Sequence, residues 1–215
     1  MGGCCRPSDF DQIFDEKRAR NKARDYARKG VTGDSRRIVE LVRRSIPPGY
    51  SLLEVGGGIG EIQLELLRDG AAHVVNVELA TQWEKSALEL LRERGLGDRV
   101  ERRLGDFVRE GDNIPAADVV VMNRVVCCYP DAEALVGAAA DHARRLLVMT
   151  LPVDRWWIRF GFAVPNVLLS FRGSTFRALV HPTHAVRSTA ERHGLRLAQH
   201  DRGIIWQLLA FGRPG

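Results

Sequence analysis

The sequence has few cysteines and no motif that would use them together. Its four cysteines form two adjacent pairs, Cys4–Cys5 and Cys127–Cys128, and neither pair has the two-residue gap of a zinc or redox motif. Free thiols suit a reducing compartment. No apolar run follows Met1, as a secretory signal peptide would require. We therefore expect a cytoplasmic protein with no metal site.

The sequence also lacks a long hydrophobic run. A transmembrane helix needs about 20 consecutive apolar residues. The nearest approach, residues 156–171, is interrupted by Arg159, Pro165 and Asn166. We therefore expect no segment that spans a membrane.

An excess of positive charge is absent from most of the chain. Residues 51–215 hold 20 basic and 20 acidic side chains, whereas residues 1–50 hold 12 basic and 7 acidic ones. A uniformly basic nucleic-acid binder is excluded, and we do not expect nucleic acid as a partner. The pattern indicates a neutral domain behind a basic leader. The leader's charge either meets an acidic group on a ligand or forms a solvated helix face.

Apolar strands alternate with helices from residue 51 onward. This alternation predicts an α/β fold with a doubly wound, mostly parallel sheet covered on both faces. The last two of seven expected strands are separated only by residues 201–203, so we expect an antiparallel hairpin at the end. The strands are expected at 51–55, 73–77, 100–104, 118–122, 146–150, 195–200 and 204–211, and the helices between them at 61–68, 81–94, 131–144 and 183–192.

Two segments fall outside this rhythm. Residues 1–49 form the helical leader, with helices expected in 9–29 and from Asp34 or Ser35 to 44. Residues 50–215 form the main domain, in which the aromatic segment 151–180 is an insertion after the fifth strand. Ligands bind near the carboxyl ends of strands in such sheets. The insertion is therefore either a lid for a ligand or a helix that covers the core.

A glycine-rich turn joins the first strand and helix of the main domain, within residues 52–67. Gly56, Gly58 and Gly60 alternate there. Such a turn lets a ligand approach the backbone and aims helix N–H groups at it. The dinucleotide-binding spacing fails, because its third glycine position holds Glu61, and the P-loop lysine is missing. Glu78 follows at the end of the next strand, where a carboxylate can accept both hydroxyls of an adenosine ribose.

Together these motifs resemble class I S-adenosylmethionine-dependent methyltransferases. Glu54 and the three glycines match that family's first motif, Glu78 its ribose-binding acid, and residues 105–107 its adenine-contacting element. The resemblance implies S-adenosylmethionine as cofactor, with binding residues Glu54, Gly56, Gly58, Gly60, Glu78, Leu79, Asp106, Phe107 and Asn123. The layout of leader, core and insertion also resembles magnesium-protoporphyrin O-methyltransferases, although Glu54 and Gly57 depart from their first motif.

The sequence indicates fewer residues for the acceptor site. Methyl transfer from a sulfonium requires alignment of donor and acceptor and exclusion of water more than it requires a dedicated base. Candidate catalytic residues are Tyr129, His181 and His184. Candidate acceptor-binding residues are Arg124, whose alternative is a surface ion pair, and Trp156 and Trp157 in the insertion. The motif of exocyclic-amine methyltransferases is absent at 123–126.

The sequence therefore predicts a methyltransferase that acts on oxygen or nitrogen of an apolar or aromatic small molecule. Two alternatives stay open: an RNA or protein methyltransferase that uses the basic leader, and a domain that binds S-adenosylmethionine or S-adenosylhomocysteine without catalysis. A homodimer is also left open. The abundance of Arg over Lys indicates a bacterial source.

Overall fold

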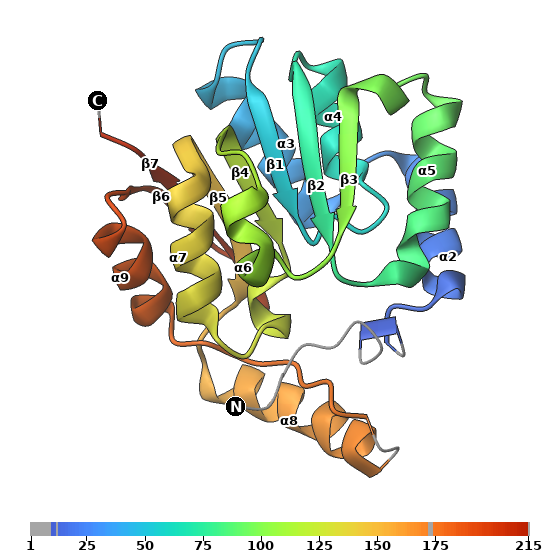
Figure 1. Cartoon of the computed structure of the whole chain (residues 1–215). Coiled ribbons are helices and arrows are strands. Elements are labelled where there is room, and N and C mark those ends of the chain that lie inside the picture. The colour runs from blue at the N-terminus through green and yellow to red at the C-terminus, as the bar shows by residue number, and fades with distance from the viewer. Residues whose placement is uncertain (1–9, 12, 172–173, 215) are drawn as a thin grey trace.

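The computed structural model describes residues 10–11, 13–171 and 174–214 (Figure 1). The pair Cys4–Cys5 lies outside this part. A seven-stranded sheet has the order β3-β2-β1-β4-β5-β7-β6. The pairs among β1 to β5 are parallel, whereas β7 is antiparallel to both β5 and β6. The predicted α/β class, with its parallel sheet and antiparallel last strand, is confirmed.

The strands carry near-continuous apolar runs, as expected where helices cover both faces. Their bounds are β1 Ser51–Val55, β2 His73–Glu78, β3 Val100–Leu104, β4 Ala117–Asn123, β5 Ala143–Pro152, β6 Arg196–Arg202 and β7 Trp206–Gly212. Alternate residues of a strand face opposite sides of the sheet. Leu53 and Val55 therefore join the apolar cluster on one face, and Leu52 joins the cluster on the other.

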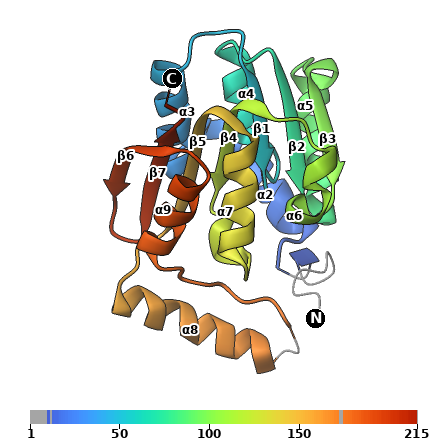
Figure 2. The same cartoon turned by 60° about the vertical axis from the view of Figure 1, so that its left-hand side comes forward.

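Helices form a layer on each face of the sheet (Figures 1 and 2). One layer contains α2 Glu16–Lys29, α3 Gly33–Ser45, α4 Glu61–Arg68 and α5 Glu84–Glu93, and the other contains α6 Phe107–Glu110, α7 Ala132–His142 and α9 Thr183–Arg192. The helices of the predicted leader are part of the first layer. Ile38 and Val42 of α3 are fully buried against the sheet, and Tyr26 of α2 donates a hydrogen bond to Glu65 of α4.

Some predicted boundaries were wrong for local reasons. Thr81 does not cap a long helix, because residues 81–83 form a short 3₁₀ turn and the Thr81 hydroxyl bonds Asp11. Asp34 and Ser35 do not cap α3, which begins one residue before Asp34. The helix predicted to reach residue 144 ends at His142, since β5 already begins at Ala143.

The insertion forms helix α8, Trp156–Phe171, which lies beyond the carboxyl ends of the strands and apart from both helical layers (Figure 2). Ile158 is its one buried residue. The chain then returns through residues 174–182 to α9, and Phe176 on this return is buried against Phe10 and Phe14. None of the helices in the described part of the chain is long and apolar enough to cross a membrane.

Candidate functional site

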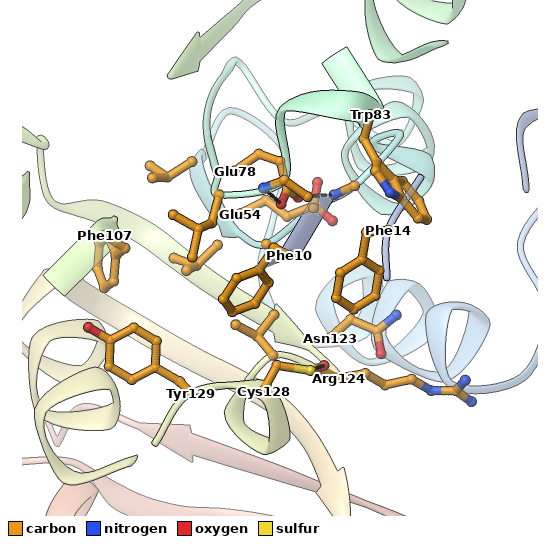
Figure 3. A pocket seen from close by; sticks show the side chains of 18 of the residues that line it. Phe10, Phe14, Glu54, Glu78, Trp83, Phe107, Asn123, Arg124, Cys128 and Tyr129 are labelled. Atoms are coloured by element: carbon orange, nitrogen blue, oxygen red, sulfur yellow. Dashed lines mark hydrogen bonds between the residues drawn. The ribbon is translucent and has the colours of Figure 1, made fainter. Parts of the chain in front are cut away.

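A cavity of about 340 Å³ opens at the carboxyl ends of β1, β2 and β4. This volume lies within the range of small-molecule sites. Its wall brings together ten of the residues that the sequence singled out: Glu54, Gly56, Gly58, Glu78, Leu79, Asp106, Phe107, Asn123, Arg124 and Tyr129. Segments more than 100 residues apart in the sequence therefore meet at one place, as Figure 3 shows for several of their side chains.

The glycine turn needs glycine for both conformation and space. Gly56 and Gly58 have positive φ angles of 65° and 58°, a region that other residues rarely adopt. A Cβ on Gly58 would lie 2.8 Å from the Trp83 ring. Gly60 also has a positive φ and precedes α4, but it does not line the cavity. The turn therefore keeps the backbone open toward the cavity. Gly60 instead provides the left-handed conformation from which α4 begins.

Glu78 ends β2 and is fixed by two backbone groups. Its Oε2 accepts a hydrogen bond from Gly58 N at 2.7 Å, and its Oε1 accepts one from Ala80 N at 2.8 Å. Burial raises the pKa of this carboxyl, while the two backbone donors and Arg102 act in the opposite direction. Each carboxylate oxygen can accept a second hydrogen bond. Glu78 can therefore bind a pair of ligand hydroxyl groups without losing its own supports.

Glu54, at the end of β1, lies in a buried polar network. Its Oε2 accepts a hydrogen bond from Asn76 Nδ2, which also donates to Gln63. Burial raises the pKa of Glu54 to about 8, and the nearby charge of Glu61 adds to this rise. The Asn76 carbonyl oxygen has no hydrogen-bond partner among the described residues. Glu54 is thus a buried acid that a positively charged ligand group would favour in its ionised form.

Asp106 and Tyr129 join two loops on one side of the cavity. Asp106 caps α6 by accepting from Val108 N at 3.0 Å. The Tyr129 hydroxyl donates to the same carboxylate at 3.1 Å. Phe107 is buried between the cavity and the His142 ring. The pair Asp106–Phe107 therefore offers a carboxylate and an aromatic face, which suits a planar heterocycle with an amino group.

Asn123 and Arg124 connect the end of β4 to α3. Asn123 Nδ2 donates to the Ser35 hydroxyl at 3.1 Å, and Arg124 Nη2 lies 2.8 Å from Asp34 Oδ2. Arg124 is the one non-glycine residue with positive φ, 61°, in the described part of the chain. Its guanidinium also lies 4.4 Å from the centre of the Trp206 ring. Such local strain is typical of functional sites, and here two partners stabilise the arginine.

Four predicted acceptor or catalytic residues lie outside the cavity wall. Trp156 and Trp157 begin α8 and point away from the site, with 79% and 37% of their surface exposed. His184 is exposed on α9. His181 lies behind Tyr129, where its Nε2 is 3.0 Å from the Tyr129 carbonyl oxygen, and burial lowers its pKa. The positions of Trp156 and Trp157 follow from α8 standing apart from the sheet.

Three aromatic wall residues were not singled out from the sequence as site residues. Phe10 and Phe14 from the leader project into the cavity, and Trp83 completes the wall beside Cys128, which the sequence had placed on the acceptor side (Figure 3). Phe176 of the insertion packs edge-on against both phenylalanines. The buried indole N–H of Trp83 has no hydrogen-bond partner in the part of the chain that the structure describes. The amphipathic pattern of the leader was visible, but its docking depends on tertiary contacts.

Among the described residues, no group of three or more His, Cys, Asp and Glu side chains could hold a metal ion. Lys22 of α2 reaches the cavity rim, where its Nζ lies 2.6 Å from Glu61 Oε1.

No protein-family model matches the sequence, and no curated protein matches it. The fold of this chain matches those of solved structures. The magnesium protoporphyrin IX methyltransferase of Synechocystis PCC 6803, with bound S-adenosylhomocysteine, is 19% identical with a TM-score of 0.67, over 84% of this chain and 82% of that one. An O-methyltransferase family 2 protein of Planctomyces limnophilus in complex with apigenin is 18% identical with a TM-score of 0.62, over 93% of this chain and 62% of that one.

A third match is the [4+2]-cyclase SpnF, which is 16% identical with a TM-score of 0.62 over 83% of this chain and 80% of that one. At these identities the likeness concerns the fold. The chain has the fold of the class I S-adenosylmethionine-dependent methyltransferases, and its cavity lies where the glycine turn and Glu78 meet.

Proposed function

We propose that this protein is an S-adenosylmethionine-dependent methyltransferase that acts on oxygen or nitrogen of an apolar or aromatic small molecule. The single observation that carries the proposal is Glu78. Its buried carboxylate stands beside an open glycine turn and keeps acceptor capacity directed at the cavity. The ribose of an adenosyl group presents the matching pair of donors.

The wall residues fit the rest of such a donor. Asp106 and Phe107 suit the adenine ring. Glu54 lies on the far side of the glycine turn, where an ionised carboxylate would attract the donor's ammonium group. When bound, the donor supplies a methyl group that is already activated by its sulfonium charge. The protein's part is to align the acceptor and to exclude water.

The aromatic part of the wall supports the acceptor class. Phe176 packs edge-on against Phe10 and Phe14. Phe10, Phe14, Tyr129 and Cys128 all line the cavity (Figure 3). Rings of this kind bind apolar or aromatic ligands through area and edge-to-face contacts. The apigenin bound to the Planctomyces neighbour is an aromatic small molecule of this type.

The acceptor assignment is tested by replacing Phe14 with alanine. We expect kcat/KM for an aromatic acceptor to fall about tenfold, mainly through a higher KM, because the variant loses buried contact area. The assay follows transfer of a labelled methyl group to a panel of phenols, catechols and aromatic amines. Phe162→Ala is the matched control, since this ring packs on Trp206 outside the cavity.

Two results would contradict this assignment. An unchanged kcat/KM in Phe14→Ala would mean that the aromatic wall does not hold the acceptor. Donor binding without transfer to any member of the panel would favour the alternative of a domain that binds the donor for another purpose, as the fold of the cyclase SpnF illustrates.

A further inference from the structure

Helix α8 carries seven of the eleven large apolar side chains that are exposed in the described part of the chain. Trp156, Phe160 and Phe171 have 79%, 69% and 86% of their surface exposed. Single exposed apolar residues are common on proteins, but a continuous row of large ones marks an interaction site. This helix therefore requires an explanation other than packing of the core.

The large exposed apolar side chains of α8 lie on one face. At about 100° per residue, they fall within an arc of about 120°: Trp156, Trp157, Phe160, Val164, Val167, Leu168 and Phe171. The opposite face is used for packing. Ile158 is buried there, Phe162 packs on Trp206, and Leu169 packs on the cluster around Phe10 and Phe176. Helix α8 therefore already packs on the protein with one face, and the exposed apolar residues form a second, separate face.

The hairpin turn between β6 and β7 extends this surface. Ile204 and Ile205 are 80% and 46% exposed. The turn is tied to the residues just before α8, because Val153 N donates to Ile205 O at 2.8 Å. Figure 2 shows α8 and the end of the hairpin at the same end of the molecule. We call α8's outward face and this turn together the apolar end surface.

The charges beside the apolar end surface are mostly positive. Helix α8 contains no acidic residue, and its one charged residue, Arg159, is exposed. Arg155 immediately precedes the helix and is also exposed. Asp154 and Arg159 form an ion pair at 2.7 Å, so these three side chains together carry one net positive charge. Apolar and aromatic side chains flanked by arginine match the interface of an anionic bilayer, in which indole rings favour the headgroup level.

The geometry of α8 argues against a second copy of the chain as the occupant. A helix of 16 residues is about 24 Å long and about 10 Å wide, so its outward face and the hairpin turn together offer on the order of 500 Å². A stable interface buries about 800 Å² per partner. Helix α8 projects from the protein as a ridge. A ridge fits against a flat, deformable surface such as a bilayer better than against the same ridge on a second molecule.

We propose that the apolar end surface binds the face of an anionic lipid bilayer, with α8 lying in the interface plane rather than crossing the membrane. The proposal goes beyond methyl transfer and does not depend on it. Leu169 on the inner face of α8 packs against the cluster beside the cavity, so the docked molecule would hold its cavity close to the lipid.

Sedimentation with lipid vesicles tests the proposal on the full chain without any cofactor. We expect the wild type to sediment with mixed phosphatidylcholine and phosphatidylglycerol vesicles. The triple variant Trp156→Ser/Phe160→Ser/Phe171→Ser should lose about tenfold or more of the partition coefficient, since three large apolar contacts disappear. Leu88→Ser is the control, because Leu88 is 49% exposed on α5, and it should bind as wild type does.

Charge is tested separately with Arg155→Gln/Arg159→Gln. This variant should bind mixed vesicles several-fold less well and pure phosphatidylcholine vesicles unchanged. Circular dichroism must show that each variant is folded. The proposal is overturned if the wild type does not sediment with vesicles, or if the triple variant binds equally well. It is also overturned if the wild type forms a concentration-dependent dimer that the triple variant abolishes, since a second copy would then cover the surface.

Discussion

Replacing Glu78 with alanine is expected to weaken the binding of S-adenosylmethionine about 100-fold or more. The variant removes the carboxylate that would accept the two ribose hydroxyls, and hydrogen bonds to charged groups contribute about 1.5–3 kcal/mol each. It also leaves the N–H groups of Gly58 and Ala80 without their present acceptor. Titration calorimetry measures the loss directly.

Two further variants distinguish the loss of a ligand contact from a change in the loop that Glu78 supports. Glu78→Gln keeps one oxygen that can accept from the backbone, so we expect a smaller loss of affinity, about tenfold. Glu89→Ala removes an exposed carboxylate from α5 and should leave the affinity unchanged. If Glu78→Ala binds the donor as tightly as the wild type while remaining folded, Glu78 is not the ribose ligand and the proposed orientation of the donor is wrong.

Replacing Glu54 with glutamine is expected to stabilise the protein at high pH and to weaken donor binding. Burial raises the pKa of Glu54 from its ordinary 4.5 to about 8 in the folded protein. Between these values the folded state keeps a proton that the unfolded state has released. The free energy of unfolding of the wild type therefore falls as pH rises through this window, and glutamine, which cannot ionise, avoids this contribution.

The expected difference between Glu54→Gln and the wild type grows from near zero at the ordinary pKa to on the order of 4 kcal/mol at the raised one. The glutamine amide can also donate to the Asn76 oxygen that has no partner among the described residues. Urea unfolding of both proteins across this pH range measures the difference. A constant difference would show that Glu54 ionises normally in the folded state.

Donor binding should respond to Glu54 with the opposite sign. An ammonium group near this carboxyl favours its ionised form, so we expect the affinity of the wild type for the donor to rise as pH increases toward about 8. The Glu54→Gln variant should bind more weakly and lack this rise. Glu54 would then destabilise the protein without ligand and favour binding of the ligand. Such a trade-off between stability and function is common at binding sites.

The sheet and the part of the cavity around the glycine turn were predictable from local sequence signals. Strand β1 and helices α4 and α9 have the bounds that their apolar runs and flanking glycines indicate. Glu54 and Glu78 were recognisable because each ends a buried strand next to the glycine turn. Such features depend on periodicity and on conformations that few residues adopt, and both are visible in a single chain.

The aromatic part of the cavity wall was not predictable, because it depends on contacts between distant segments. The sequence indicated Trp156 and Trp157 as acceptor-binding residues on the basis of their aromatic character, yet they face outward. Phe14 and Phe176 lie 162 residues apart and meet beside the cavity with ring centres 5.8 Å apart. Likewise, Asp34 was expected to cap a helix and instead pairs with Arg124. No local pattern distinguishes these outcomes.

Calorimetry of the wild-type protein with S-adenosylmethionine and S-adenosylhomocysteine is the decisive test of donor binding. We expect both ligands to bind, one per chain, and adenosine to compete with them through the hydroxyl pair that Glu78 accepts. If neither ligand binds to the folded protein, the cavity at the ends of β1, β2 and β4 is not a site for this donor, and the proposed methyl transfer is wrong.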